Sequence, residues 1–180
     1  MREDRRRSGH DSHLLRRREG KDHLCLWLAL RAAGRGRKVL ITQFLKSGDS
    51  GERAAIAHVP GVTLLEVPER MKFTFRMTEE EKISFGAQMK ALLEQTRAVV
   101  EKGELGMLVM DECCAAVAKG LLPLEDVLSL LDSVPEELEV IITGRNPDPA
   151  LVERADYITE MKKIRHPFDK GVAARKGIEW

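Results

Sequence analysis

Hydrophobic residues in this chain fall into short continuous runs separated by longer amphipathic stretches. A short apolar run is typical of an inner strand of a parallel sheet, because both faces of such a strand are buried. Apolar positions three and four residues apart are typical of a helix that covers the sheet. The predicted strands are 39–44, 62–67, 107–112, 139–143 and 157–163, and the predicted helices are 22–33, 52–58, 78–102, 113–119, 123–132 and 148–155.

This alternation predicts an α/β fold of three layers, a parallel sheet with helices on both faces. Gly34 and Gly36 follow the first helix as cap residues, and Thr78 with Glu81 has the spacing of a capping box at the start of the long helix. A chain of 180 residues suits one domain with a sizeable core.

The most informative strand is 107–112, an apolar run that ends in Asp111 and Glu112. Acidic residues at the carboxyl end of such a strand lie where open α/β sheets bind their ligands. A core strand followed by an ordinary acidic turn is the alternative, and this stretch alone does not decide between them.

Composition excludes some classes of function. The 30 Lys and Arg residues nearly balance the 29 Asp and Glu residues, so no overall field favours nucleic acid or an anionic membrane. No apolar run approaches the roughly 18 residues that a membrane span needs. The three cysteines include the adjacent pair Cys113 and Cys114, which suits neither a disulfide nor a zinc site and favours a reducing compartment, so we expect a cytoplasmic protein.

Residues 1–21 differ from the rest, with two arginine triplets and no usable hydrophobic period. They predict a disordered or non-native basic arm, followed by a single domain over 22–180. Because arginines are not buried unpaired, we expect the first strand of the sheet to be missing, which leaves a gap or an exposed edge. A nucleic-acid-binding module that uses this arm is an alternative, although acidic residues dilute its charge.

A phosphate-binding loop is expected just before the first helix, where backbone N–H groups can hold phosphates. Gly20-Lys21 stands there, but Asp22 occupies the position of the Ser or Thr that would reach magnesium, and no glycine closely precedes Gly20. As written, the segment is not a P-loop.

After Leu28 the chain carries an ordered set of segments with characteristic spacing. They are 28–34, 43–46 with Gly51-Glu52, 73–75, 110–112, 143–146, 159–161, 166–171 and 176–179. Together they resemble the P-loop-type cob(I)alamin (corrinoid) adenosyltransferases, in family order. The resemblance implies a P-loop NTPase fold of RecA-like type.

The resemblance also implies a reaction. Such enzymes transfer the 5′-deoxyadenosyl group of ATP to Co(I) of a corrinoid and release triphosphate, in adenosylcobalamin synthesis. Reduced cobalt is the nucleophile, so the protein supplies orientation and electrostatics, and no protein nucleophile is expected. The resemblance further implies Mg²⁺, a reductase that supplies Co(I), and a homodimer.

Six residues match positions at which the family binds its substrates. Asp111 and Glu112 are expected to hold Mg²⁺ beside the triphosphate, and Arg145 and Asn146 to contact the nucleotide. Phe73 and Phe75 are expected to cover the lower face of the corrinoid, although Lys72 and Phe75 replace the family's glycine and tryptophan. Each pair also has an alternative without a ligand. The acidic pair could form an ordinary turn, the Arg-Asn pair a solvated turn, and the two aromatic residues could pack in the core.

A shift of the reading frame would explain the missing phosphate loop. Codons exist for residues 13–25 that, read from the second base, encode I-Y-Y-G-E-G-K-G-K-T-T-S-A, a strand and P-loop of the family's type. We therefore hypothesise that residues up to about 27 are translated out of frame. A diverged homologue with a genuine basic arm is one alternative, and a non-enzymatic corrinoid-binding protein that lacks a nucleotide site is another.

Overall fold

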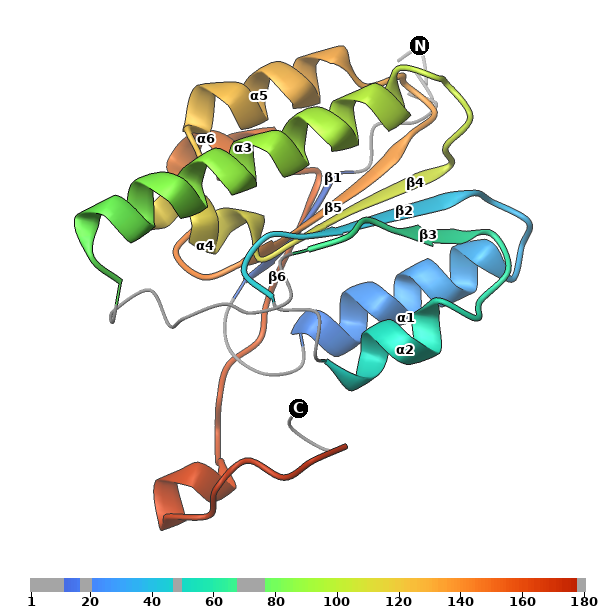
Figure 1. The fold of residues 1–180 in the computed structure, drawn as a ribbon. Coiled ribbons are helices and arrows are strands. Elements are labelled where there is room, and N and C mark those ends of the chain that lie inside the picture. The colour runs from blue at the N-terminus through green and yellow to red at the C-terminus, as the bar shows by residue number, and fades with distance from the viewer. Residues whose placement is uncertain (1–11, 17–20, 47–49, 68–76, 178–180) are drawn as a thin grey trace, which may run out of the picture.

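The computed structural model describes residues 12–16, 21–46, 50–67 and 77–177. Its centre is a six-stranded sheet in the order β3-β2-β4-β5-β1-β6, and every strand pair in it is parallel (Figure 1). The strands are β1 (Ser12–Arg16), β2 (Val39–Gln43), β3 (Val62–Leu64), β4 (Met107–Asp111), β5 (Glu139–Gly144) and β6 (Tyr157–Glu160).

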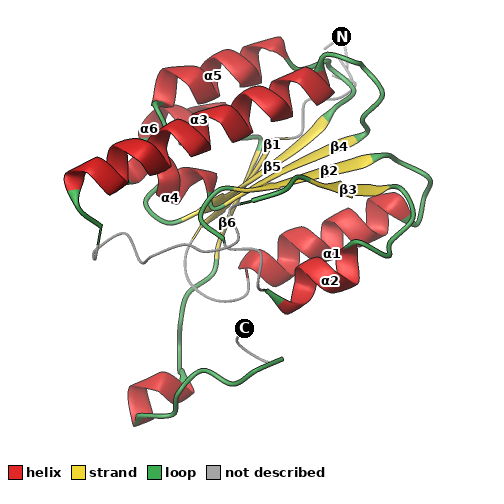
Figure 2. Ribbon diagram, viewed as in Figure 1, coloured by secondary structure: helices red, strands yellow, loops and turns green. Residues whose placement is uncertain are grey.

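Helices cover both faces of the sheet (Figure 2), which confirms the predicted three-layer architecture. The helices α1 (Lys21–Ala33) and α2 (Gly51–Ile56) lie on one face. On the other face lie α3 (Glu79–Val100), α4 (Cys113–Ala118), α5 (Leu124–Ser133) and α6 (Pro149–Arg154). A short 3-10 helix, Pro167–Lys170, lies in the segment that extends away from the sheet after β6.

The sheet is buried on both sides because successive side chains of a strand point to opposite faces. In β4, Leu108 and Met110 pack in the core beneath α3 and α5, whereas Met107 and Val109 pack in the core beneath α1. All five residues of β4 are buried, which explains why this strand has a continuous apolar run instead of an alternating one.

The prediction that the first strand is missing is wrong. Ser12–Arg16 pairs in parallel with both β5 and β6 and so lies inside the sheet, and the expected disordered arm does not hold for these residues. Pairing of this kind uses main-chain groups that every residue except proline carries. The paired segment also has an apolar centre, Leu14-Leu15, with its one arginine at the carboxyl end. Residues 1–11 and 17–20, which include most of the predicted arm and part of the candidate phosphate loop, lie outside the described residues.

Several predicted boundaries hold and others shift. The predicted strand 62–67 ends at Leu64, because its ladder with β2 ends at the Ile41–Leu64 pair. The capping box of Thr78 and Glu81 is present, with both reciprocal hydrogen bonds. β6 is shorter than the predicted strand 157–163, because its ladder with β1 ends at the Arg16–Glu160 pair. Pro123 is the N-cap of α5 and not its first helical residue. Within the described residues, no helix is both long and apolar enough to cross a membrane.

Candidate functional site

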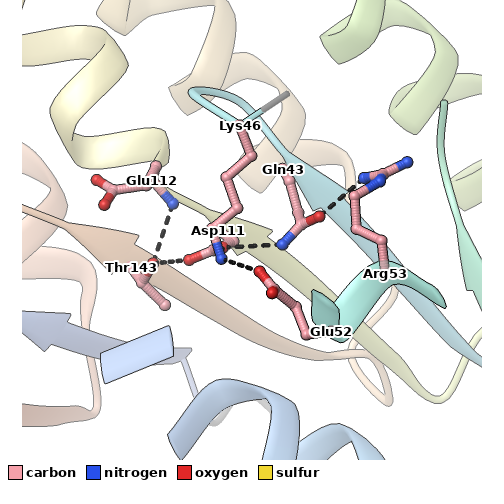
Figure 3. A network of polar contacts seen from close by, with 7 residues as sticks. All are labelled: Gln43, Lys46, Glu52, Arg53, Asp111, Glu112 and Thr143. Atoms are coloured by element: carbon pink, nitrogen blue, oxygen red, sulfur yellow. Dashed lines mark hydrogen bonds and ion pairs between the residues drawn. The ribbon is translucent and has the colours of Figure 1, made fainter. Parts of the chain in front are cut away.

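Polar side chains gather at the carboxyl edge of the sheet, where β2, β4 and β5 end side by side (Figure 3). The ladder places Gln43 opposite Asp111, and the next strand brings Thr143 to the other side of Asp111. All three side chains are fully buried. Because buried polar groups are costly unless they are hydrogen-bonded, their partners define how this edge is built.

Asp111 is the centre of this network, and both of its carboxylate oxygens are engaged. Oδ1 accepts a hydrogen bond of 2.6 Å from the Thr143 hydroxyl. Oδ2 accepts one of 3.3 Å from Nε2 of Gln43 and lies 3.2 Å from Nζ of Lys46. A buried carboxylate with three partners of this kind acts as an anchor for the strand ends around it.

Glu112 follows directly but has different surroundings. Its backbone is left-handed, with φ 58°, and its N–H donates to the Thr143 hydroxyl over 3.0 Å. Its side chain is only partly buried, whereas that of Asp111 is 1% exposed. A left-handed non-glycine residue costs about 1 kcal/mol, and the Thr143 contact holds it in place. Of the two predicted acidic residues, Glu112 is the more accessible to a ligand.

Gly144 allows α4 to approach this edge. Its φ is 145°, and a Cβ built there would lie 2.7 Å from the backbone nitrogen of Ala115 and 2.7 Å from Cβ of Cys114. Only glycine tolerates both this positive φ and this close approach of α4. The two adjacent cysteines, Cys113 and Cys114, are completely buried, and burial raises the pKa of the Cys113 thiol. A protonated, buried thiol is unreactive, which agrees with a packing role.

Lys46 and Glu52 extend the network to α2. Nζ of Lys46 lies 2.7 Å from Oε1 of Glu52 as well as close to Asp111, so one ammonium bridges two carboxylates. Burial is the largest single influence and acts to raise the pKa of Glu52, but the hydrogen bond and charge of Lys46, together with weaker hydrogen bonds, hold the pKa below its ordinary value. One positive charge thus lies between two negative ones, which favours the ionised form of both carboxylates.

Arg53 completes the network from the next position of α2. Its Nη1 donates to Oε1 of Gln43 over 2.8 Å, and its Nη2 donates to the carbonyl of Leu65 over 3.0 Å. Sequence reasoning gave no individual role to Gln43, Lys46, Glu52 or Thr143, although all four stand in the segments that carry the resemblance. Arg53 could have been noticed in the sequence, because it directly follows the Gly51-Glu52 segment that carries the resemblance.

The remaining predicted site residues are only partly located by the structure. Arg145 and Asn146 follow β5 at the same edge; Arg145 is exposed, and Asn146 is left-handed with φ 52°. Their position agrees with a role toward a ligand but does not test it. Phe73 and Phe75 lie outside the described residues, so the predicted corrinoid wall remains a prediction.

The acidic side chains at this edge indicate what kind of metal ion could bind there. No group of three or more His, Cys, Asp or Glu side chains arranged to hold a metal occurs in the described part of the chain. Mg²⁺ does not need such a group, since it is usually bound by one or two carboxylates together with substrate phosphates and water. Glu112 fits that requirement. Asp111 fits it less well as a direct ligand, because its oxygens already have protein partners.

Comparison with known proteins decides the family. Residues 17–180 match the family model of ATP:corrinoid adenosyltransferase BtuR/CobO/CobP. The chain belongs to this family. The match covers the whole sheet except β1 and includes every residue of the network around Asp111. Membership confirms the suspected family and the predicted enzyme class, a transferase.

Individual relatives agree with the family match. The corrinoid adenosyltransferase of Pseudomonas aeruginosa is 31% identical over 163 residues, which are 90% of this chain and 79% of that protein. The corrinoid adenosyltransferase of Escherichia coli strain K12 is 32% identical over 168 residues, 90% of this chain and 81% of that protein. Corrinoid adenosyltransferase CobA of Salmonella typhimurium is also 32% identical, with the same coverage.

Proposed function

We propose that this adenosyltransferase family member binds ATP with Mg²⁺ at the carboxyl edge of β2, β4 and β5, and transfers the 5′-deoxyadenosyl group to Co(I) of a corrinoid. The cobalt electron pair forms a bond to C5′, the bond from C5′ to its oxygen breaks, and that electron pair leaves with triphosphate. The observation that carries the proposal is the acidic end of β4 at this edge in a chain of this family.

Within this site the described residues would have separate tasks. Glu112 would hold Mg²⁺, with Asp111 as the buried anchor behind it. Mg²⁺, when bound, would neutralise charge on the phosphates. Arg145 and Asn146, just after the end of β5, would contact the nucleotide, since a guanidinium suits phosphate oxygens. Because the nucleophile belongs to the corrinoid, these residues orient and stabilise and do not attack.

The corrinoid side of the site rests on Phe73 and Phe75. An apolar wall under the macrocycle would exclude an axial ligand from cobalt and make Co(I) easier to reach. Substituting both with alanine should weaken corrinoid binding and leave ATP binding unchanged. A loss of ATP binding with corrinoid affinity intact would contradict this assignment.

The segment before α1 limits the activity of the chain as written. Asp22 stands where a P-loop has Ser or Thr, so we expect weak ATP binding and slow turnover. We further propose that residues up to about 27 are out of frame. The shifted reading of residues 13–25, which encodes a strand and a P-loop just before the apolar part of α1, supports this. Sequencing of the coding DNA upstream of Leu28 tests it directly, because codons incompatible with the shifted reading would exclude the hypothesis.

An anaerobic assay with a Co(I) corrinoid and ATP tests the function. We expect little adenosylcorrinoid from the chain as written and a marked gain from a variant with residues 13–25 in the shifted frame. Full activity of the chain as written would refute the frame hypothesis alone. No product from either protein would refute the proposed reaction.

A non-enzymatic corrinoid-binding protein is the alternative, and corrinoid binding without ATP binding by both proteins would favour it. The family also suggests a homodimer, a reductase that supplies Co(I), and a cytoplasmic location, which we include in the proposal. Light scattering after size-exclusion chromatography tests the dimer.

A further inference from the structure

Two residues of α2 are linked to Asp111 through intermediate side chains, by two separate routes (Figure 3). Glu52 pairs with Lys46, whose Nζ lies 3.2 Å from Oδ2 of Asp111. Arg53 donates to Oε1 of Gln43, whose Nε2 donates to the same Oδ2 over 3.3 Å. Two successive residues of a short helix on one face of the sheet therefore converge on one carboxylate oxygen at the end of β4.

Arg53 determines which way the side-chain amide of Gln43 is oriented. A side-chain amide can place either its NH₂ group or its oxygen toward a neighbour. Toward Asp111 only the NH₂ group is favourable, because an amide oxygen beside a carboxylate would be repelled. Arg53 can only donate, so its bond to Oε1 leaves Nε2 facing Asp111.

Arg53 is itself held in place. Its second nitrogen donates to the Leu65 carbonyl just after β3. The chain of contacts then runs from Leu65 through Arg53, Gln43 and Asp111 to Thr143, across the carboxyl ends of four adjacent strands, β3, β2, β4 and β5. Thr143 continues it by accepting from the backbone N–H of Glu112.

We propose that Arg53 is a positioning residue of the candidate site. It orients the Gln43 amide, which fixes Asp111, and Asp111 with Thr143 fixes the left-handed backbone of Glu112. The consequence for nucleotide binding rests on the proposed function, whereas the coupling between α2 and Glu112 does not.

Nuclear magnetic resonance of the full chain tests the coupling. The readout is the backbone N–H of Glu112, three hydrogen-bonded side chains away from Arg53. Arg53→Met should shift this signal and speed its exchange with water. Gln43→Leu should do the same, and the double variant should show no further change, because both substitutions break one chain of contacts. Arg154→Met is the control, since Arg154 pairs with Asp132 on the surface, and it should leave the signal in place.

If Arg53 served only to stabilise α2, Arg53→Met would leave the Glu112 signal unchanged. An unchanged Glu112 signal in Arg53→Met, or effects of the two substitutions that add, would overturn the proposal. In the anaerobic assay, made in the variant with residues 13–25 in the shifted frame, Arg53→Met should raise KM for ATP by about tenfold or more and leave KM for the corrinoid unchanged. Absence of turnover in the shifted-frame protein, with and without Arg53→Met, would count against the proposed function, while the magnetic resonance result would still decide the coupling.

Discussion

The Thr143 hydroxyl donates to the Asp111 carboxylate over 2.6 Å and accepts the N–H of Glu112 over 3.0 Å. One side chain on β5 thus holds both acidic residues at the carboxyl end of β4. This contact explains how a fully buried aspartate and a left-handed glutamate can be neighbours at the edge of the sheet.

Thr143→Val should destabilise the protein by about 2–3 kcal/mol, because the change keeps the shape of the side chain but leaves Asp111 Oδ1 and the Glu112 N–H without this partner. Unfolding in urea measures the loss. Thr63→Val is the matched control, since Thr63 is exposed on β3 and should change stability by less than about 0.5 kcal/mol. Equal effects of the two substitutions would show that the Thr143 contacts contribute nothing.

Asp111→Asn and Glu112→Gln should show that Asp111 mainly stabilises the fold and that Glu112 mainly binds the ligand. Asp111→Asn should cost about 3 kcal/mol of stability, because it removes the buried charge that pairs with Lys46. Glu112→Gln should cost much less, because its side chain is only partly buried, but it should weaken binding of Mg²⁺ and ATP. Thermal or urea unfolding and calorimetric titration measure the two effects. A larger loss of stability for Glu112→Gln would reverse the assigned roles.

Gly144→Ala should destabilise the protein by about 3 kcal/mol or more, because the new Cβ meets the backbone of α4 and the residue keeps a φ of 145°. Gly103→Ala is the control for a positive φ without a steric contact. Gly103 also has a positive φ, 68°, but nothing lies within 4 Å of its Cβ position, so about 1–2 kcal/mol is expected. Unfolding of both variants in urea measures the difference, and no difference would show that α4 can shift freely.

Stability should depend on pH through Glu52. Its folded pKa lies below the ordinary value of 4.5, so its ionised form stabilises the fold above about pH 4.5, and this contribution is lost as the pH falls through the folded pKa. The free energy of unfolding of the unsubstituted chain, relative to Glu52→Gln, should therefore decrease on acidification.

Lys46→Met checks the cause of that pH dependence. Burial is the largest influence on Glu52 and raises its pKa, and Lys46 supplies the leading opposing contact. In a Lys46→Met background, the free energy of unfolding relative to the same background with Glu52→Gln should therefore no longer decrease at acidic pH. Urea unfolding at several pH values measures this difference in free energy. If the difference depended on pH as it does with Lys46 present, Lys46 would not be what holds Glu52 ionised.

Local sequence patterns determined much of this protein. The apolar run that ends in Asp111 predicted a central parallel strand with acidic residues at its carboxyl end, and β4 is that strand. The capping box at Thr78 and the glycines after α1 placed helix boundaries. These predictions succeeded because side-chain periodicity and capping depend on residues a few positions apart.

The tertiary structure decided what the carboxyl edge looks like. Gln43, Asp111 and Thr143 are far apart in the chain and meet only because β4 lies between β2 and β5. Local patterns do not encode that strand order, so they could not show that Asp111 is saturated by protein groups while Glu112 is more accessible. The pairing of Ser12–Arg16 was missed for a related reason, because a strand can join a sheet through its main chain once neighbouring strands leave a position for it.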